Sequence, residues 1–311
     1  MDILATLESS AAYLIVMAGG YLLKRLGVFG VQHARAFSKV IMTVTLPAAI
    51  LHGAAGAQFN AVLVLTVVMS VCLNALLMGM GAAVSRGLPG RDRALCALNS
   101  NTFNTGNFAM PFLSGFVGAD AFAAICMFDM GSAITTFGPN YAVACALMGA
   151  RDGKKIGLRD IVKSMLTTPT FDTYLFVVLL NVMHWQLPKL AADTVAMAAG
   201  ANTFLAMLTI GILFDLKFEK GGAGLIARVL GVRYAVCSAV AVLLWFFFPA
   251  PAETVRTLCI TAMAPIANCA TIITVEQGCD GTVSAVINSL SMVISVAVML
   301  TLLLFLPMPV R

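Results

Sequence analysis

Long apolar stretches follow one another from one end of the chain to the other, separated by short segments. A helix that spans the hydrocarbon core of a bilayer needs about 20 mostly apolar residues. We expect ten such helices, at Ala5–Leu23, Phe37–Ala55, Ala61–Val84, Ala94–Phe116, Ala121–Met148, Thr170–Trp185, Ala191–Phe214, Leu225–Phe247, Thr254–Val275 and Val283–Leu306. Hydrophobic residues make up 60% of the 311 and charged residues only 11%, which excludes an ordinary soluble domain. The sequence therefore predicts an all-α integral membrane protein.

The basic residues predict the orientation in the membrane, because Lys and Arg are retained in short cytoplasmic loops. With the N-terminus outside, sixteen of the nineteen fall on the cytoplasmic side: Lys24, Arg25, Arg35, Lys39, Arg86, Arg91, Arg93, Arg151, Lys154, Lys155, Arg159, Lys163, Lys217, Lys220, Arg228 and Arg233. We expect a multi-pass protein with both termini on the non-cytoplasmic side. Compact loops and the absence of a transit peptide favour a bacterial inner membrane. The basic residues are not gathered with aromatics on one face, so no nucleic-acid partner is expected.

The most polar segment, Arg151–Lys163, divides the ten stretches into five and five. A duplicated half with an odd number of spans must insert upside down, as in the inverted repeats of secondary transporters. We therefore expect a first five-helix repeat at 1–150, a cytoplasmic inter-repeat loop at 151–168 and a second, inverted five-helix repeat at 169–311.

The fourth and ninth stretches each contain residues that oppose a continuous helix. Asn99–Pro111 has four asparagines, a glycine and a proline, and Ala264–Thr271 again places a proline beside a polar amide. Proline removes an amide donor, and free backbone groups at membrane depth are tolerated only inside protein or facing a water-filled cavity. Prolines can also simply kink a membrane helix, which is our interpretation of Pro47. For the fourth and ninth stretches we predict broken helices that meet at a substrate cavity.

These residues resemble the auxin efflux carrier family, which includes bacterial permeases for malonate and related organic acids. Asn104-Thr105 with Met110-Pro111 is similar to the family's fourth helix, and Pro265 followed by Val275–Gly278 and Asp280 is similar to its ninth. The Gly20–Gly27 region and Leu46-Pro47 also fit, so the resemblance covers essentially the whole chain.

The resemblance implies a fold like that of bile-acid/sodium symporters, in which a panel subdomain supports a core subdomain whose crossed fourth and ninth helices present the substrate. Two features depart from many plant members. The central loop is short, and Asn268 lies three residues after its proline. Auxin itself is therefore not implied.

A half-helix that begins at the midplane directs unpaired amide donors and a positive dipole end at the cavity, which suits a carboxylate. Asn104, Asn107 and Asn268 would add neutral donors. Such a site needs no basic residue at the bilayer centre, where one costs at least about 2.5–3.5 kcal/mol. The candidate substrate-binding residues are Asn104, Thr105, Asn107, Pro111, Pro265, Asn268 and Thr271.

Asp129 is the clearest acidic residue within a span, which suggests a proton carrier or a cation ligand. The alternative is a structural pairing with a nearby amide, and Asn101 and Ser100 are the expected neighbours. Glu276, at the expected cytoplasmic end of the ninth helix, is read first as a solvated capping or gating carboxylate. Asn101, Asp129 and Glu276 are the candidate coupling-ion or proton residues, with Na⁺ or H⁺ as the ion. No other cofactor or bound metal is expected, because the eight cysteines have no metal-ligand spacing.

The leading functional hypothesis is a secondary active transporter of a small organic anion, malonate or a similar carboxylate, that works by alternating access at the crossing of helices four and nine. Two alternatives stay open: a sodium-coupled symporter of a larger amphipathic anion, and a membrane receptor that transports nothing. An enzyme is not expected, because no nucleophile–base pair or metal cluster is visible at membrane depth. The expected partners are the carboxylate and the lipid bilayer, and a homodimer is compatible with the chain.

Overall fold

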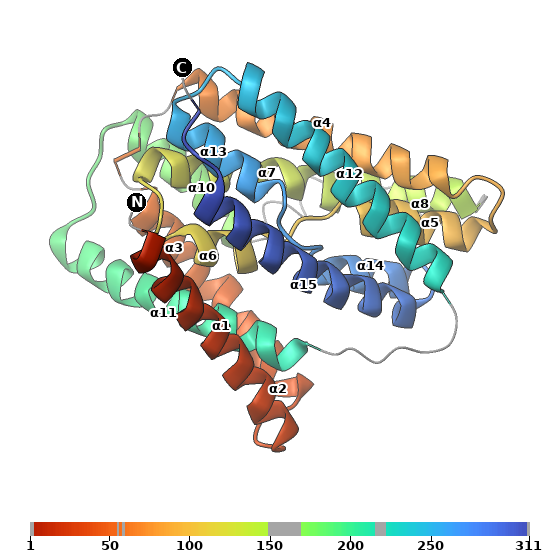
Figure 1. Cartoon of the computed structure of the whole chain (residues 1–311). Helices are drawn as coiled ribbons and strands as arrows, with labels where there is room; N and C mark the ends of the chain where they lie inside the picture. The colour runs from red at the N-terminus through yellow and green to blue at the C-terminus, as the bar shows by residue number, and fades with distance from the viewer. Residues whose placement is uncertain (1–2, 55, 58–59, 149–168, 215–221, 310–311) are drawn as a thin grey trace.

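Helix is the only regular secondary structure in the computed structural model, which describes residues 3–54, 56–57, 60–148, 169–214 and 222–309 (Figure 1). The predicted inter-repeat loop at 151–168 lies outside the described residues. Two π-helical segments, η1 and η2, interrupt the α-helices. The elements are α1 (Ile3–Arg25), α2 (Val31–Val40), η1 (Ile41–Thr45), α3 (Leu46–Gly53), α4 (Ala61–Val84), α5 (Gly90–Ser100), η2 (Thr105–Ala109), α6 (Met110–Leu113), α7 (Ala119–Phe137), α8 (Pro139–Met148), α10 (Pro169–Val182), α11 (Lys189–Leu213), α12 (Ala223–Phe247), α13 (Ala252–Thr261), α14 (Asn268–Glu276) and α15 (Gly281–Phe305).

Several helices are suited to a lipid environment. Within the described ranges, five continuous helical segments are long and apolar enough to cross a membrane: Val31–Gly53, Ala61–Val84, Lys189–Leu213, Ala223–Phe247 and Gly281–Phe305. Large apolar side chains on them face outward, as Met197 and Phe247 do, with 81% and 77% of their surface exposed. In water such exposure would be unfavourable, whereas in a bilayer these side chains contact lipid. The all-helical membrane protein predicted from the sequence is confirmed.

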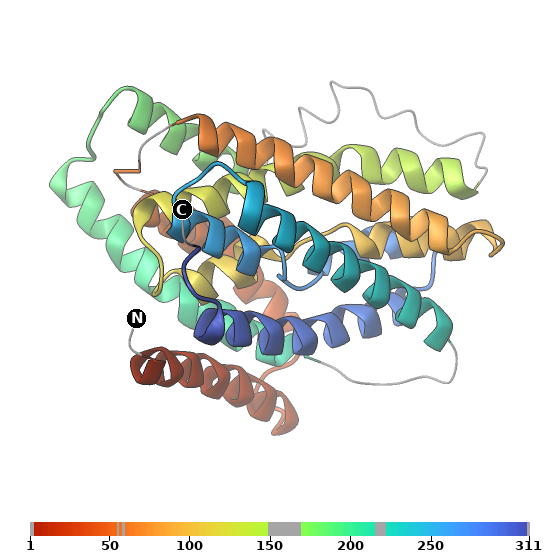
Figure 2. The ribbon, with the colours of Figure 1, turned by 45° about the horizontal axis from the view of Figure 1, so that its top comes forward.

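The helices pack as two groups. In the panel group, α11 packs against α1, α2 and α3, and α10 packs against α3. In the crossover group, α4 packs against α5, α7 and α12, while α13, α14 and α15 complete the bundle. Figure 2 shows α4 running alongside α12, away from α1. The groups meet where α7 contacts α3 and α10, and where α11 contacts η2 and α6.

The close packing of α1 on α11 depends on two glycines. A Cβ atom added at Gly20 would collide with the carbonyl oxygen of Leu208, and one added at Gly211 would collide with that of Met17. Small residues let membrane helices approach closely enough for van der Waals packing, which drives helix association in lipid. The two glycines therefore fix the distance between these helices.

The fourth and ninth predicted stretches are both interrupted. α5 ends at Ser100 and helical structure resumes at Thr105, while α13 ends at Thr261 and α14 begins at Asn268. The two interruptions are joined, because the Asn104 backbone N–H donates to the Pro265 carbonyl oxygen at 2.8 Å. Two segments more than 150 residues apart in sequence thus satisfy each other's backbone at the centre of the fold.

Proline does not cause the first interruption, contrary to the prediction made from the sequence. Pro111 lies within α6, several residues after the non-helical segment, and only Pro265 lies inside a break. Pro111 and Pro47 each follow a π-helical turn, η2 and η1 respectively. The wider turn accommodates the ring and its missing N–H without ending the helix. The fifth predicted stretch is also divided, at Gly138, into α7 and α8.

Arg233 does not belong to a cytoplasmic loop, and its assignment there from the sequence is wrong. It lies ten residues into α12, about 15 Å along the helix axis at 1.5 Å per residue. Its side chain is completely buried. A basic residue therefore does lie at membrane depth, which the charge pattern did not indicate.

We predict that Gly211→Ala destabilises the protein by about 1–3 kcal/mol, the usual cost of forcing atoms into a packed interface. Thermal unfolding in detergent would measure the effect as a lower midpoint. Gly200→Ala on the same helix is the matched control, since a Cβ there meets nothing within 4 Å. Equal midpoints for the two variants would contradict this account of the α1–α11 contact.

Candidate functional site

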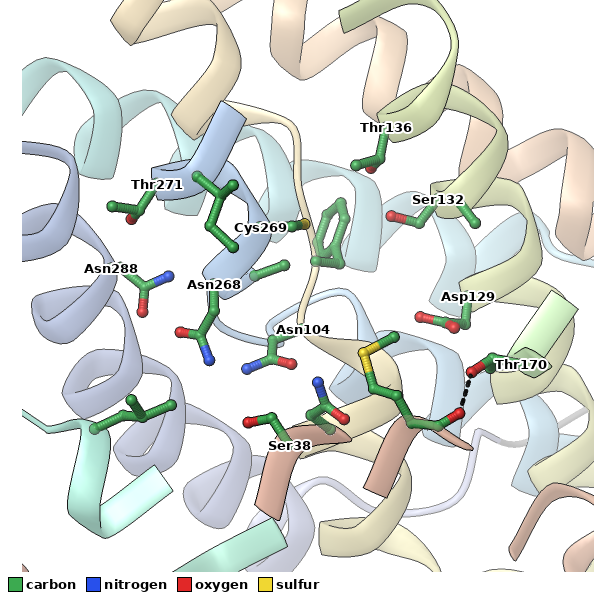
Figure 3. Close-up of a pocket in the computed structure, with 18 of the residues that line it drawn as sticks. Ser38, Asn104, Asp129, Ser132, Thr136, Thr170, Asn268, Cys269, Thr271 and Asn288 are labelled. Atoms are coloured by element: carbon green, nitrogen blue, oxygen red, sulfur yellow. Dashed lines mark hydrogen bonds between the residues drawn. The ribbon is translucent and has the colours of Figure 1, made fainter. Parts of the chain in front are cut away.

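A cavity of about 820 Å³ lies between the two helix groups, next to both helix interruptions. The panel group contributes residues of α2, η1 and α10 to its wall, among them Ser38, Met42 and Tyr174. The crossover group contributes the two breaks, one face of α7 and one face of α15. Figure 3 shows polar side chains from both groups, among them Ser38, Asn104 and Asn268, around a common space. A ligand held there would contact both groups at once.

Five of the predicted site residues line this cavity. The first break supplies Asn104, η2 supplies Asn107, α14 supplies Asn268 and Thr271, and α7 supplies Asp129. In Figure 3 the Asn104 and Asn268 side chains are directed into the same space from opposite breaks. The crossing of the two broken stretches therefore brings together amides that are more than 160 residues apart.

Other predicted residues lie elsewhere. Pro111 lines a separate cavity of about 280 Å³ between α3, α6 and α11. Pro265 takes part through its backbone carbonyl, and Thr105 is buried beside the cavity. Glu276 is exposed at the last residue of α14. Asn101 is fully buried, and its amide donates to the side-chain oxygen of Asn140 on α8.

The first break and η2 carry buried polar side-chain atoms with no partner within the described residues. In and next to the cavity wall these are Nδ2 of Asn104, Oγ1 of Thr105 and Oδ1 of Asn107, and Oδ1 of Asn101 and Oγ1 of Thr102 are unpaired as well. Buried polar atoms in native proteins are nearly always paired, and an unpaired one points to an absent water, ion or ligand. Asn104 is only 3% exposed and still faces the cavity. Its free amide N–H₂ is a donor suited to an anionic or carbonyl oxygen.

Two helix starts lie at the same cavity. α14 begins with Asn268, and Ala267, Asn268 and Cys269 all line the wall. η2 begins with Thr105, next to Gly106, another wall residue. The first amides of a helix have no intrahelical acceptor, and its N-terminus carries roughly half a positive charge. Backbone and side-chain donors therefore converge on one region, as binding of a carboxylate requires.

A polar network behind the cavity holds α14 in place. Asn99 donates to the Thr274 hydroxyl at 3.1 Å and accepts from the Ser284 hydroxyl at 2.6 Å. Ser284 also reaches the Thr271 hydroxyl at 3.1 Å. About two turns further along α15, the Ser291 hydroxyl accepts a hydrogen bond from the backbone N–H of Ile266 at 3.0 Å. Side chains of α5 and α15 thus hold α14 by side-chain hydrogen bonds, and Ser291 of α15 replaces a backbone bond that the broken helix lacks.

This network was not among the features predicted from the sequence, although the sequence carries a signal for it. Ser284, Asn288, Ser291 and Ser295 recur along the last apolar stretch at helical spacing and form one polar stripe. All four are buried. On an otherwise apolar membrane helix such a stripe indicates a face that is turned to protein rather than to lipid.

Asp129 has a different partner from the one expected. Its Oδ2 accepts a hydrogen bond of 2.6 Å from the Tyr174 hydroxyl on α10. The expected neighbours are engaged elsewhere, since Asn101 bonds Asn140 and the Ser100 hydroxyl bonds the Cys96 carbonyl. The other groups beside the Asp129 carboxylate are Thr105 and the backbone of Gly106. This bond links the crossover group to the panel group across the cavity wall.

The described residues hold no cluster of three His, Cys, Asp or Glu side chains that could bind a metal ion. The polar part of the site is instead built from amides, hydroxyls, two helix starts, one carboxylate (Asp129) and one arginine (Arg35). It is suited to reversible binding of a polar solute, because each of these groups forms hydrogen bonds without a covalent step.

We predict that Ser284→Ala lowers the free energy of unfolding by about 1–3 kcal/mol, because Asn99 and Thr271 lose a buried partner. Thermal unfolding in detergent would measure it. Thr301→Ala on the same helix is the control, since that hydroxyl is exposed and bonds only its own helix. A loss no larger than the control's would show that the network does not hold α14.

Comparison with known proteins gives two matches. A family model described as "Membrane transport protein" matches residues 6–150. A protein of Methanothermobacter thermautotrophicus described as "Uncharacterized transporter" is 22% identical over 285 residues, which cover 90% of this chain and 91% of that protein. Both descriptions agree with a site built to bind and release a solute within a membrane.

Proposed function

We propose that this chain, a member of the membrane transport protein family to which the auxin efflux carriers belong, is a secondary active transporter of a small organic anion, malonate or a similar carboxylate. The observation that carries the proposal is the convergence of the unpaired Asn104 amide and the start of α14 on one cavity. These donors match a carboxylate and need no charged residue in direct contact with it. Membrane transport itself is supported by both comparisons.

The proposal also includes the number and arrangement of the membrane crossings. We infer ten membrane crossings arranged as two inverted five-helix repeats, residues 1–150 and 169–311, joined by the loop at 151–168. The breaks support this, because α5 to α6 and α13 to α14 are each the fourth crossing of a half. The fold would then be of the bile-acid/sodium symporter kind, with crossed helices four and nine.

Alternating access is supported by two cavities at the boundary between the groups. The larger one reaches Val31 at the start of α2, Leu213 at the end of α11 and Gly281 at the start of α15. These positions adjoin the loops that we place in the cytoplasm. The smaller one lies against Pro111, His52 and Asn202, toward the opposite ends of these helices. Movement of the crossover group along the panel group would expose the site to each side in turn.

The proposal predicts that purified protein in liposomes takes up labelled malonate, and that Asn104→Ala and Asn268→Ala weaken this uptake roughly 10- to 100-fold. That range follows from about 1.5–3 kcal/mol for a hydrogen bond to a charged group. Asn60→Ser is the control, because serine can replace asparagine as the N-cap of α4. Folded protein that moves neither malonate nor other small carboxylates would contradict the proposal and favour a receptor.

Asp129 is the proposed site of proton coupling. The groups around its carboxylate are the Tyr174 hydroxyl, Thr105 and the Gly106 backbone, which offer hydrogen-bond donors. A sodium site would instead surround the cation with oxygen ligands. Because the Tyr174 bond crosses between the helix groups, relative movement would break it and change the affinity of the carboxyl for a proton.

We predict that Asp129→Asn abolishes uptake driven by a proton gradient while exchange of labelled for unlabelled substrate continues, because binding remains but the proton carrier is lost. Uptake and exchange assays in the same liposomes would separate the two. Asp193→Asn, an exposed acid on α11, is the control. Gradient-driven uptake that survives in Asp129→Asn would remove the carboxylate from coupling.

The size of the cavity favours one second candidate. About 820 Å³ is far larger than a malonate ion, and Phe103, Met42 and Ile272 add apolar wall. A larger amphipathic anion would fill that space. Competition of labelled malonate uptake by a long-chain or sterol carboxylate would reveal such a substrate, and competition by short diacids alone would favour the first candidate.

A further inference from the structure

Arg233 is a completely buried arginine that joins the two broken helices from behind the cavity. Its Nη1 donates to the Ser100 carbonyl oxygen at 2.9 Å and its Nη2 to the Ala264 carbonyl oxygen at 2.7 Å. Its Cζ lies 4.3 Å from the centre of the Phe103 ring, which itself lines the cavity. Arg233 does not line the cavity, so it does not contact a substrate directly.

The two carbonyls that Arg233 binds belong to the ends of the two half-helices. Ser100 is the last residue of α5, and Ala264 lies three residues beyond the end of α13. The C-terminus of a helix carries about half a negative charge, so two such ends together carry roughly one. A single guanidinium matches that charge. No carboxylate is among the electrostatic neighbours of Arg233 in the described part of the chain.

Secondary transporters with broken helices commonly place a coupling cation at this kind of position, where unwound carbonyls and half-helix C-termini coordinate Na⁺ or H⁺. In this chain the guanidinium already takes up the Ser100 and Ala264 carbonyls. A sodium ion at the same oxygens would lie against a fixed positive charge in a medium of low dielectric constant, which is strongly unfavourable.

We propose that Arg233 is a built-in cation of the crossover: it fills the place of a coupling sodium ion between the Ser100 and Ala264 carbonyls, so this site does not use sodium. The proposal rests on the proposed transport function and deepens it, because it removes sodium as the ion at the crossing of the broken helices. Arg233 is thus a positioning residue that holds the Ser100 and Ala264 carbonyls of the two breaks together behind the cavity, and it places a positive charge behind the bound anion.

The first test uses the unmodified protein without any substrate. Its thermal unfolding midpoint in detergent is compared in choline, sodium and lithium chloride at equal ionic strength. We expect equal midpoints in the three salts, since the cation site is already filled. A higher midpoint in sodium than in choline would show that the protein binds sodium. If Arg233→Ala changes that sodium effect, the proposal is overturned. If the variant leaves the effect unchanged, the sodium binds elsewhere and the assignment of the crossing to Arg233 stands.

The second test empties the site with Arg233→Ala. We expect a lower midpoint that millimolar guanidinium chloride raises again, because the free ion can bind the two vacated carbonyls. The unmodified protein is the matched control, because its Ser100 and Ala264 carbonyls already accept from Arg233. Its midpoint should not rise at the same guanidinium concentration. An equal rise in both proteins, or a rise in neither, would overturn the proposal.

The conservative variants keep the test decisive where alanine prevents folding. Arg233→Lys retains one positive charge, and its midpoint should not respond to added guanidinium. Arg233→Gln retains volume without charge and should respond as the alanine variant does. Because these measurements involve no substrate, they succeed or fail independently of malonate uptake. A failed uptake assay would contradict the transport function, whereas absence of guanidinium recovery would contradict the built-in cation.

Discussion

The fold depends on satisfying backbone polar groups where two membrane helices are interrupted. Each unpaired amide or carbonyl in a bilayer costs several kcal/mol, so a broken helix persists only when other groups replace its missing bonds. Here the Asn104 backbone N–H donates to the Pro265 carbonyl oxygen, and the Arg233 side chain donates to one carbonyl oxygen from each break. Ser291 and Asn288 of α15 bond the backbone of Ile266. The two breaks are therefore stable only together, as one crossing.

The crossing of the two broken helices also creates the cavity. Once α14 and η2 start at membrane depth, their first amides face a space that neither helix can fill. Polar residues from neighbouring helices line that space, and some of their atoms, such as Asn104 Nδ2, have no partner in the described chain. The same requirement that forces the two breaks to meet thus leaves donors available to a solute.

The position of the cavity between two helix groups matters as much as its lining. The panel group is held by glycine-mediated contact of α1 with α11, and the crossover group by the polar network around α14. The Asp129–Tyr174 hydrogen bond spans the boundary. Bonds within each group can persist while those across the boundary exchange, which is the mechanical condition for alternating access. In the proposed cycle Arg233 supplies a fixed positive charge behind the site, and Asp129 carries the coupled proton at the boundary between the groups.

Much of the fold could be predicted from residue order alone. Apolar length gave the membrane class, and the helix edges lie close to the predicted stretches, as for α4 at Ala61–Val84. The breaks within Asn99–Pro111 and Ala264–Thr271 could be predicted because a cluster of Asn, Gly and Pro disfavours a continuous helix. The amides Asn104, Asn107 and Asn268 could be predicted for the same reason. These features depend on local propensity and on the thickness of the bilayer, which sequence records directly.

Only the tertiary structure decided which residues face one another. Sequence assigned Arg233 to a loop and offered Asn101 or Ser100 as possible neighbours of Asp129, whereas packing buries the arginine against two helix ends and pairs the carboxylate with Tyr174. It also separates Pro111 and Glu276 from the main cavity. Hydrogen bonds between distant polar groups determine how each helix is rotated about its axis. They also determine the crossing, which joins residues over 150 positions apart. No local sequence pattern encodes that pairing. The membrane class and the broken helices can therefore be predicted from the sequence, whereas the residues that pair to complete the site are determined only by the tertiary packing.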